Sequence, residues 1–95
     1  MLTGKQKRYL RSLAVNEKAL FQIGKEGLSL NLFESINQAL KARELVKISI
    51  LKTCDEDINE LVVDICANTK AELVQVIGKT VVLYKQSKER LIRLP

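Results

Sequence analysis

The sequence predicts an α/β fold, with one domain over residues 1–95, a four-stranded mixed sheet and the element order α-β-α-β-α-β-β. Apolar residues recur at helical spacing in three segments, and shorter apolar runs suited to strands lie between and after them. Two strand–helix–strand units favour parallel strands, whereas the hairpin that closes the chain requires an antiparallel pair. The predicted sheet is therefore mixed.

The first helix is predicted to begin after Thr3, because Thr3 and Gln6 have the spacing of a capping box. Its short apolar stripe consists of Leu10, Leu13 and Ala14. After a connector, residues 19–23 form a short apolar segment that we predict to be a strand ending at Gly24.

The second helix follows the turn at residues 24–27, and either Ser29 or Asn31 can cap it. Its apolar residues fall at helical spacing and are Leu32, Phe33, Ile36, Ala39 and Leu40. Residues 45–51 are predicted to form the second strand, because apolar residues alternate there with Lys47 and Ser49.

The third helix is predicted to begin at Asp55, with acidic residues in its first turn, where the helix macrodipole favours them. Its buried stripe is predicted to be Ile58, Leu61, Val62, Ile65 and Cys66. Asn68 is a suitable residue to end this helix.

Residues 73–77 and 80–85 are predicted to form a hairpin around Gly78 and Lys79, since glycine suits the first position of a type II′ turn. This turn gives one face the apolar pairs Val76–Val81 and Val74–Leu83. It gives the other face the pairs Leu73–Tyr84, Gln75–Val82 and Ile77–Thr80. We expect the first face to pack against helices and the second to be mixed in character.

The composition excludes most catalytic and metal sites. The chain has no histidine, which rules out Ser-His-Asp and Cys-His arrangements and histidine-containing zinc sites. The two cysteines, Cys54 and Cys66, are too few for an all-cysteine zinc site and lack C-x-x-C spacing. We expect free thiols in a reducing compartment, with a disulfide as the alternative. We therefore predict no enzyme activity, no catalytic residue, no metal and no cofactor.

Nucleotide and membrane binding are not expected either. The segment Gly78-Lys79-Thr80 is similar to the end of a Walker A loop, but that motif needs a glycine where Leu73 stands. The longest strongly apolar run, residues 81–84, is far shorter than the roughly 20 residues that cross a bilayer. No apolar segment of the signal-peptide kind follows the basic N-terminus. We expect a cytoplasmic protein without a small-molecule substrate. The sequence does not give the oligomeric state, and we favour a monomer.

Charge is distributed unevenly along the chain. Sixteen Lys and Arg against eleven Asp and Glu give a net charge of +5, which points to a polyanionic partner. Residues 1–11 contain four basic residues and no acidic one, whereas residues 55–64 contain five acidic residues and no basic one. The four basic residues are Lys5, Lys7, Arg8 and Arg11. The first three lie in the early turns, where the macrodipole disfavours cations, so bound phosphates would remove a penalty.

The glycine loop, Gly24-Lys25-Glu26-Gly27, joins a predicted strand to a predicted helix. Glycine allows positive φ and close approach of the backbone, and the N–H groups that open the next helix favour phosphate. Lys25 adds a positive charge that Glu26 partly cancels. Two glycines at this spacing also occur in plain turns.

Two of the four aromatic residues are candidates for stacking on bases. Phe21 and Phe33 are expected in the core, while Tyr9 and Tyr84 could present their rings to nucleic acid. The alternative for each tyrosine is a half-buried ring with its hydroxyl in water.

Several segments, in this order, resemble the CRM domain family (chloroplast RNA splicing and ribosome maturation), and in particular its bacterial single-domain members of the YhbY type. The segments are LTGKQKRYLR at residues 2–11, IGKEGLS at 23–29, QALKARELVK at 38–47, and VQVIGKTVVLYK at 74–85 with LP at 94–95. The resemblance covers nearly the whole chain.

This resemblance implies an RNA-binding module in the maturation of the large ribosomal subunit, with structured ribosomal RNA and pre-large-subunit particles as partners. It also implies a fold similar to the C-terminal domain of translation initiation factor 3. The RNA-binding residues that it implies are Lys5, Lys7, Arg8, Arg11, Gly24, Lys25, Glu26 and Gly27. The GxxG loop of KH domains joins two helices, whereas this one follows a strand. Glu26 departs from a purely basic loop.

Our primary hypothesis is non-catalytic RNA binding by one face made of the first helix and the glycine loop, with the acidic third helix turned away from RNA. The alternative is a protein-interaction module in which residues 55–60 dock a basic ribosomal protein or assembly factor. A metal site at Asp55, Glu56 and Asp57 is disfavoured against a solvated helix start.

Overall fold

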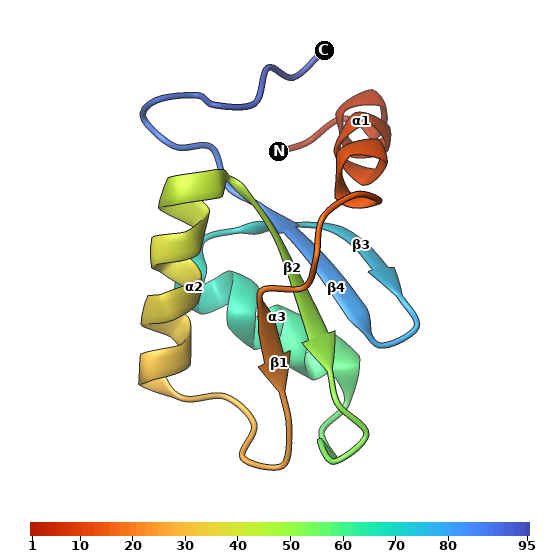
Figure 1. Cartoon of the computed structure of the whole chain (residues 1–95), viewed down its shortest axis with the longest axis vertical. Helices are drawn as coiled ribbons and strands as arrows, with labels where there is room; N and C mark the ends of the chain where they lie inside the picture. Colours follow the sequence, from red (N-terminus) through yellow and green to blue (C-terminus); the bar gives the residue numbers. More distant parts are fainter.

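Three helices and four strands alternate along the chain in the predicted order (Figure 1). The computed structural model describes all 95 residues. The helices are α1 (Gly4–Ala14), α2 (Leu30–Arg43) and α3 (Ile58–Thr69), and the strands are β1 (Phe21–Ile23), β2 (Leu45–Ile50), β3 (Glu72–Ile77) and β4 (Thr80–Tyr84). None of the helices has the length and apolar character needed to cross a bilayer.

The four strands form one mixed sheet in the order β1-β2-β4-β3, which confirms the predicted fold class. β1 and β2 pair in parallel and are joined through α2, while β4 pairs antiparallel with both β2 and β3. The second crossover, through α3, does not place β3 beside β2. β4 turns back at the hairpin and lies between β2 and β3 in the sheet.

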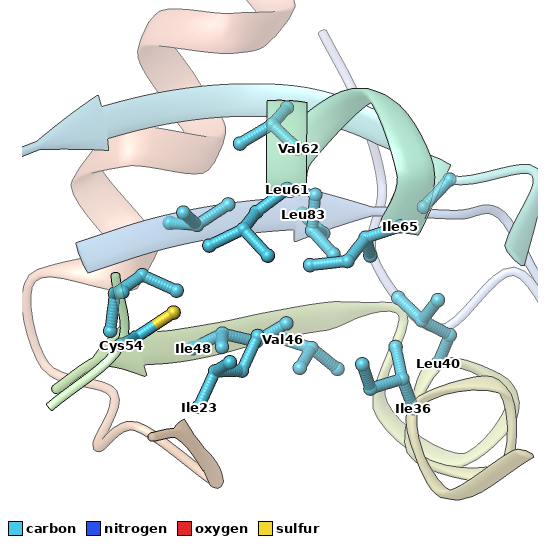
Figure 2. Close-up of a cluster of buried hydrophobic side chains, with 13 residues drawn as sticks. Ile23, Ile36, Leu40, Val46, Ile48, Cys54, Leu61, Val62, Ile65 and Leu83 are labelled. Atoms are coloured by element: carbon cyan, nitrogen blue, oxygen red, sulfur yellow. The ribbon is translucent and has the colours of Figure 1, made fainter. Parts of the chain in front are cut away.

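α2 and α3 cover one face of the sheet and enclose the larger hydrophobic cluster (Figure 2). Side chains of β2 alternate between the two faces, so Val46 and Ile48 both point toward these helices. Ile36 from α2 and Leu61 and Ile65 from α3 pack in the same cluster. Burial of a side chain of this size contributes about 1.5–3 kcal/mol to stability. The cluster therefore fixes both helices on this face.

The β3–β4 hairpin contains a bulge that was not expected from the sequence. Gly78 has a φ of 55°, as the first position of a type II′ turn requires. The pairs nearest the turn are the predicted ones, Ile77–Thr80, Val76–Val81 and Gln75–Val82. The predicted pairs Val74–Leu83 and Leu73–Tyr84 are wrong, because the register shifts and the observed pairs are Leu73–Leu83 and Glu72–Tyr84.

The second face of the sheet is also covered, contrary to our expectation that only one face packs against helices. The bulge directs Val74 to this face, where it joins Val82 and Tyr84 in a second cluster. α1 lies over these residues and buries Leu10 and Ala14 against them. The C-terminal segment completes the cluster with Ile92 and Leu94.

Glu44 anchors the C-terminal segment. It ends α2 with a φ of 67°, and its side chain is fully buried. One carboxylate oxygen accepts hydrogen bonds from the Ser87 backbone N–H (2.7 Å) and hydroxyl (2.6 Å), and the other accepts one from the Ile92 N–H (2.7 Å). Burial alone would raise the pKa of this carboxyl, but the hydrogen bonds hold the pKa below its ordinary value.

Local signals predicted most helix ends, but not the start of α3. The capping box at Thr3 and the cap at Ser29 are confirmed. α3 begins at Ile58 and not at Asp55, because the carboxylate of Asp57 accepts the Asn59 N–H at 2.7 Å and caps the helix. The acidic residues before Asp57 therefore lie in the connection between β2 and α3.

Candidate nucleic-acid interface

α1 presents Lys5 and Arg8 on the side that faces away from the sheet, and Lys7 and Arg11 at the flanks of its buried stripe. Lys5, Arg8 and Tyr9 have the i, i+3, i+4 spacing of one helix face, and all three are exposed. Lys7 and Arg11 lie four residues apart and are half-buried. These five residues are called the basic face of α1 below. The structure thus places all four predicted cations of this helix within reach of solvent.

No carboxylate neutralises the basic face of α1. The first turn of α1 contains no acidic residue. The structure contains one ion pair, at 3.8 Å between the N-terminal ammonium and Glu72, and no Lys or Arg side chain takes part in one. Neutral groups cap the helix instead, because Thr3 Oγ1 accepts from the Gln6 N–H at 3.1 Å. The cations of α1 are therefore free to bind a polyanion.

The C-terminal segment, which carries two further basic residues, packs against α1, a contact that was not expected from the sequence. Gln6 Nε2 donates to the Pro95 carbonyl at 3.3 Å, so the end of this segment lies against α1. Arg90 and Arg93 are exposed along it. The alternation of Ile92 with Leu94 was the available signal, since two apolar residues at this spacing can anchor an extended segment.

The glycine loop forms a tight turn that leads into α2. The Gly27 N–H donates to the Gly24 carbonyl at 3.0 Å, and Gly27 has a φ of 67°. Lys25 and Glu26 are exposed at the tip of the turn. Two residues separate the loop from Leu30, the first residue of α2. The first turn of α2 carries no acidic residue.

The packing of the protein itself accounts for both glycines of the loop. A Cβ on Gly24 would lie 3.1 Å from Thr53 Oγ1 and 3.3 Å from Leu51 Cδ1. A Cβ on Gly27 would collide with the carboxylate of Glu56, and the positive φ there disfavours any other residue. The loop thus packs against the β2–α3 connection. The positive φ favours glycine at position 27, and the side chains of Leu51 and Thr53 leave little room at position 24, without any ligand.

Acidic residues surround the glycine loop, contrary to our expectation that the acidic segment is turned away from the binding surface. The Glu56 side chain lies against Gly27. In residues 24–27 and 52–57 the exposed charged residues are two basic and four acidic. The basic ones are Lys25 and Lys52. The field at the loop is therefore much less positive than the field at α1.

The structure does not bring α1 and the glycine loop together. In Figure 1, α1 lies near one end of the longest axis of the molecule, and the loop between β1 and α2 lies at the other end. The single continuous face expected from the sequence is thus two separate regions. A ligand that contacts both must extend along the molecule.

The two candidate stacking tyrosines have different environments. Tyr9 is 39% exposed on the basic face of α1, whereas Tyr84 is 2% exposed beneath α1 and the C-terminal segment. Burial raises the pKa of Tyr84, and the charges of Glu44 and Glu72 raise it further. Its hydroxyl has no hydrogen-bond partner. Tyr84 is a core residue, and only Tyr9 can stack on a base.

Both cysteines are free thiols, and Cys54 belongs to the cluster in Figure 2. Burial raises the pKa of the Cys66 thiol, which makes it a poorer nucleophile. No group of three or more Cys, Asp or Glu side chains is close enough together to hold a metal ion.

A family model described as the CRS1 / YhbY (CRM) domain matches residues 2–85. The chain belongs to this family. "Probable RNA-binding protein YqeI" of Bacillus subtilis is 50% identical to this CRM domain over the full length of both chains. An "RNA-binding protein" of Haemophilus influenzae is 36% identical over 99% of this chain and 95% of its own. The resemblance stated from the sequence motifs is therefore confirmed.

A solved structure has the same fold. The solution structure of SAV1595 from Staphylococcus aureus, described as a candidate RNA-binding protein, matches this CRM domain with a TM-score of 0.83. The two chains are 50% identical, and the match covers the whole of each. The names of these two relatives and of this neighbour all describe RNA-binding proteins.

Proposed function

We propose that this CRM domain is a non-catalytic RNA-binding protein whose main contact is the basic face of α1. The supporting observation is that four cations are accessible on one helix with no carboxylate partner. Phosphates bound at this helix would release counterions and would offset the unfavourable position of Lys5 and Lys7 near a helix N-terminus.

Tyr9 would complement these cations by stacking on an unpaired base. Its ring is exposed on the same face as Lys5 and Arg8. Stacking of a base on an aromatic side chain contributes about 1–3 kcal/mol and does not depend on which base is present. Cations together with an exposed aromatic ring suit RNA that has both base-paired helices and unstacked bases.

We further propose that the ligand is structured ribosomal RNA in precursors of the large subunit, and that binding assists subunit assembly. This step is supported by the CRM resemblance, and the surface charge alone would serve any RNA. Contacts to phosphates carry no sequence information. A protein of this kind would recognise RNA mainly by shape.

The glycine loop is proposed as a weaker second contact through Lys25. Lys25 is exposed at the tip of the turn, close to the N-terminus of α2, whose N–H groups attract phosphate. Glu26 and Glu56 lie beside it and oppose the approach of a polyanion. We expect the loop to contribute less than α1.

Titration of a fluorescently labelled ribosomal RNA fragment at increasing salt tests the proposal. Each phosphate neutralised contributes about −0.7 on a single strand and about −0.9 on a double helix to the slope of log affinity against log salt, so four cations contribute roughly −3 to −4. Affinity that does not change with salt would contradict RNA binding through α1. Crosslinking of RNA in cells, followed by sequencing, tests the ligand, and a lack of enrichment of ribosomal RNA would contradict that assignment.

The acidic segment supports a second candidate function, the docking of a basic ribosomal protein or assembly factor. Asp55, Glu56 and Asp57 are all exposed next to the glycine loop. Protein partners that remain bound after nuclease treatment of a pull-down would favour this function. Their loss on nuclease treatment would favour RNA.

A further inference from the structure

A polar groove is lined by residues of α2, the C-terminal end of α3 and Lys85. Both helices, whose positions are seen in Figure 1, pack on the opposite face of the sheet from α1. The volume of the groove is about 820 Å³, and no hydrophobic residue lines it. It therefore does not suit an apolar peptide or a lipid chain. None of the side chains proposed above to bind RNA lines it, and only Asn31, in the first turn of α2, lies next to the proposed contact at the glycine loop.

Three lysines and one carboxylate give the groove a positive charge. Lys41 lies in α2, Lys70 is the C-cap residue that follows α3, and Lys85 directly follows β4. Glu34 is the only acidic residue in the lining. None of the three lysines forms an ion pair. A neighbouring hollow shares Lys41 and Lys85 and adds Lys88 and Glu89, whose charges cancel, so the excess of positive charge is confined to the groove.

The floor of the groove is rigidly connected. Lys85 Nζ donates to the Thr69 carbonyl at 2.9 Å and ties the end of β4 to the end of α3. The Thr69 hydroxyl donates to the Ile65 carbonyl at 2.7 Å. A groove of this kind is formed before a ligand arrives, so binding does not require these elements to be ordered.

Lys70 occupies a backbone position that favours glycine. It has a φ of 62°, in the left-handed region, at the point where helices commonly end with glycine or asparagine. A long cationic side chain at this position places its charge in the groove lining at the cost of backbone strain. Backbone conformation alone does not explain a lysine there.

Amide side chains complete the lining in a way that suits RNA. Asn31, Asn37, Gln38 and Asn68 offer both donors and acceptors. Asn68 Nδ2 donates to the Asp64 carbonyl at 2.8 Å, which leaves its Oδ1 free to accept. Such groups can pair with the 2′-hydroxyls that distinguish RNA from DNA, while the lysines bind phosphates.

We propose that this α2–α3 groove binds a second RNA segment through its phosphates and 2′-hydroxyls. This inference rests on the proposed function and extends it. Because the sheet lies between the groove and the basic face of α1, one molecule would hold two RNA segments on opposite sides. This CRM domain would then bridge parts of a folding RNA that are distant in sequence.

Sedimentation velocity with an RNA hairpin too short to reach both sides of the sheet tests the inference. We expect the wild-type protein to bind two hairpins at saturation and the Lys41→Gln/Lys70→Gly variant to bind one. The control is Lys18→Gln/Lys79→Gln, which removes the same charge at two exposed lysines outside the groove and outside α1. The control should still bind two hairpins.

The outcomes separate this inference from the proposed function. One hairpin on the wild-type protein, or two on the groove variant, would overturn the second site and leave RNA binding intact. No hairpin on the wild-type protein would overturn RNA binding itself. Thermal unfolding checks the fold of the groove variant. Lys70→Gly removes the backbone strain of a lysine in the left-handed region, so we expect the variant to lose the second hairpin with no fall in melting temperature.

Discussion

α1 and the glycine loop both contain the residues expected of an RNA contact, yet their surroundings differ. The cations of α1 have no acidic neighbour in the first turn and no ion-pair partner. Lys25 in the loop is next to Glu26, and Glu56 packs against Gly27. A motif therefore does not determine the electrostatic potential at its own position, because residues brought there by the fold contribute as much as the motif does.

The C-terminal segment packs against α1 but not against the glycine loop, so loss of its anchor, Glu44, should affect α1 and leave the loop unchanged. We expect Glu44→Ala to lower the free energy of unfolding by about 3 kcal/mol, because it removes hydrogen bonds to a buried charge and leaves donors on Ser87 and Ile92 unpaired. Urea unfolding measures this loss. Hydrogen exchange should accelerate in residues 86–94 and not in residues 24–27, and equal acceleration in both would contradict the anchoring role.

The pH dependence of stability provides a second check on Glu44. Its pKa is lower in the folded chain than its ordinary value of 4.5. Such a group contributes stability above the unfolded-state pKa and loses that contribution as the pH falls through the folded-state pKa. The stability difference between the wild type and Glu44→Gln should therefore shrink on acidification below about pH 4.5. A difference that is constant with pH would contradict this role of the carboxylate.

The next largest effect is expected on the basic face of α1. We expect Arg8→Glu to weaken RNA binding about tenfold, which corresponds to the loss of roughly 1.4 kcal/mol from a lost phosphate contact and a new repulsion. The melting temperature should not fall, because an acidic residue suits the N-terminal half of a helix. Fluorescence anisotropy and thermal melts measure both quantities. Lys18→Glu is the matched charge reversal and should have a smaller effect.

The same reversal in the glycine loop should have a smaller effect than in α1. We expect Lys25→Glu to weaken binding about threefold, because acidic neighbours already limit the attraction of phosphate at this loop. The melting temperature should stay nearly unchanged, since Lys25 is exposed. If Lys25→Glu weakened binding more than Arg8→Glu, the ranking of the two regions would be reversed. Undiminished binding by both variants would place the site elsewhere.

The smallest expected effect is an increase in affinity. Glu56→Gln removes a negative charge beside Gly27, so we expect RNA affinity to rise about twofold if the loop contacts phosphate. Asp64→Asn is the control, because it removes an equal charge from an exposed position within α3. An equal rise in both variants would indicate a general charge effect and no local contact at the loop.

The features predicted correctly from the sequence depend on residues close together in the chain. The capping box joins Thr3 to Gln6, and the hairpin turn depends on Gly78. Periodicity likewise predicted the three helices, since it is a property of each segment alone. The basic face of α1 follows from the same local pattern.

The features that were missed depend on contacts between distant segments. β1 pairs in parallel with β2, and Ile23 lies opposite Ile50, so Gly24 and Leu51 leave the sheet side by side. This pairing brings the acidic connection against the glycine loop, which no local pattern reveals. Tyr84 is likewise buried by α1 and a segment that follows it in the chain. The bulge at Val74 reflects the same packing, because α1 offers that residue a buried position.

The central claim is that RNA binds first to the basic face of α1, and an NMR titration of the labelled protein with a ribosomal RNA fragment tests it most directly. Up to the first equivalent, we expect the largest amide shift changes in α1, smaller changes in residues 24–27, and the weakest in the acidic residues 55–57. Changes concentrated in residues 24–27 or 55–57, with the amides of α1 unmoved, would contradict the claim.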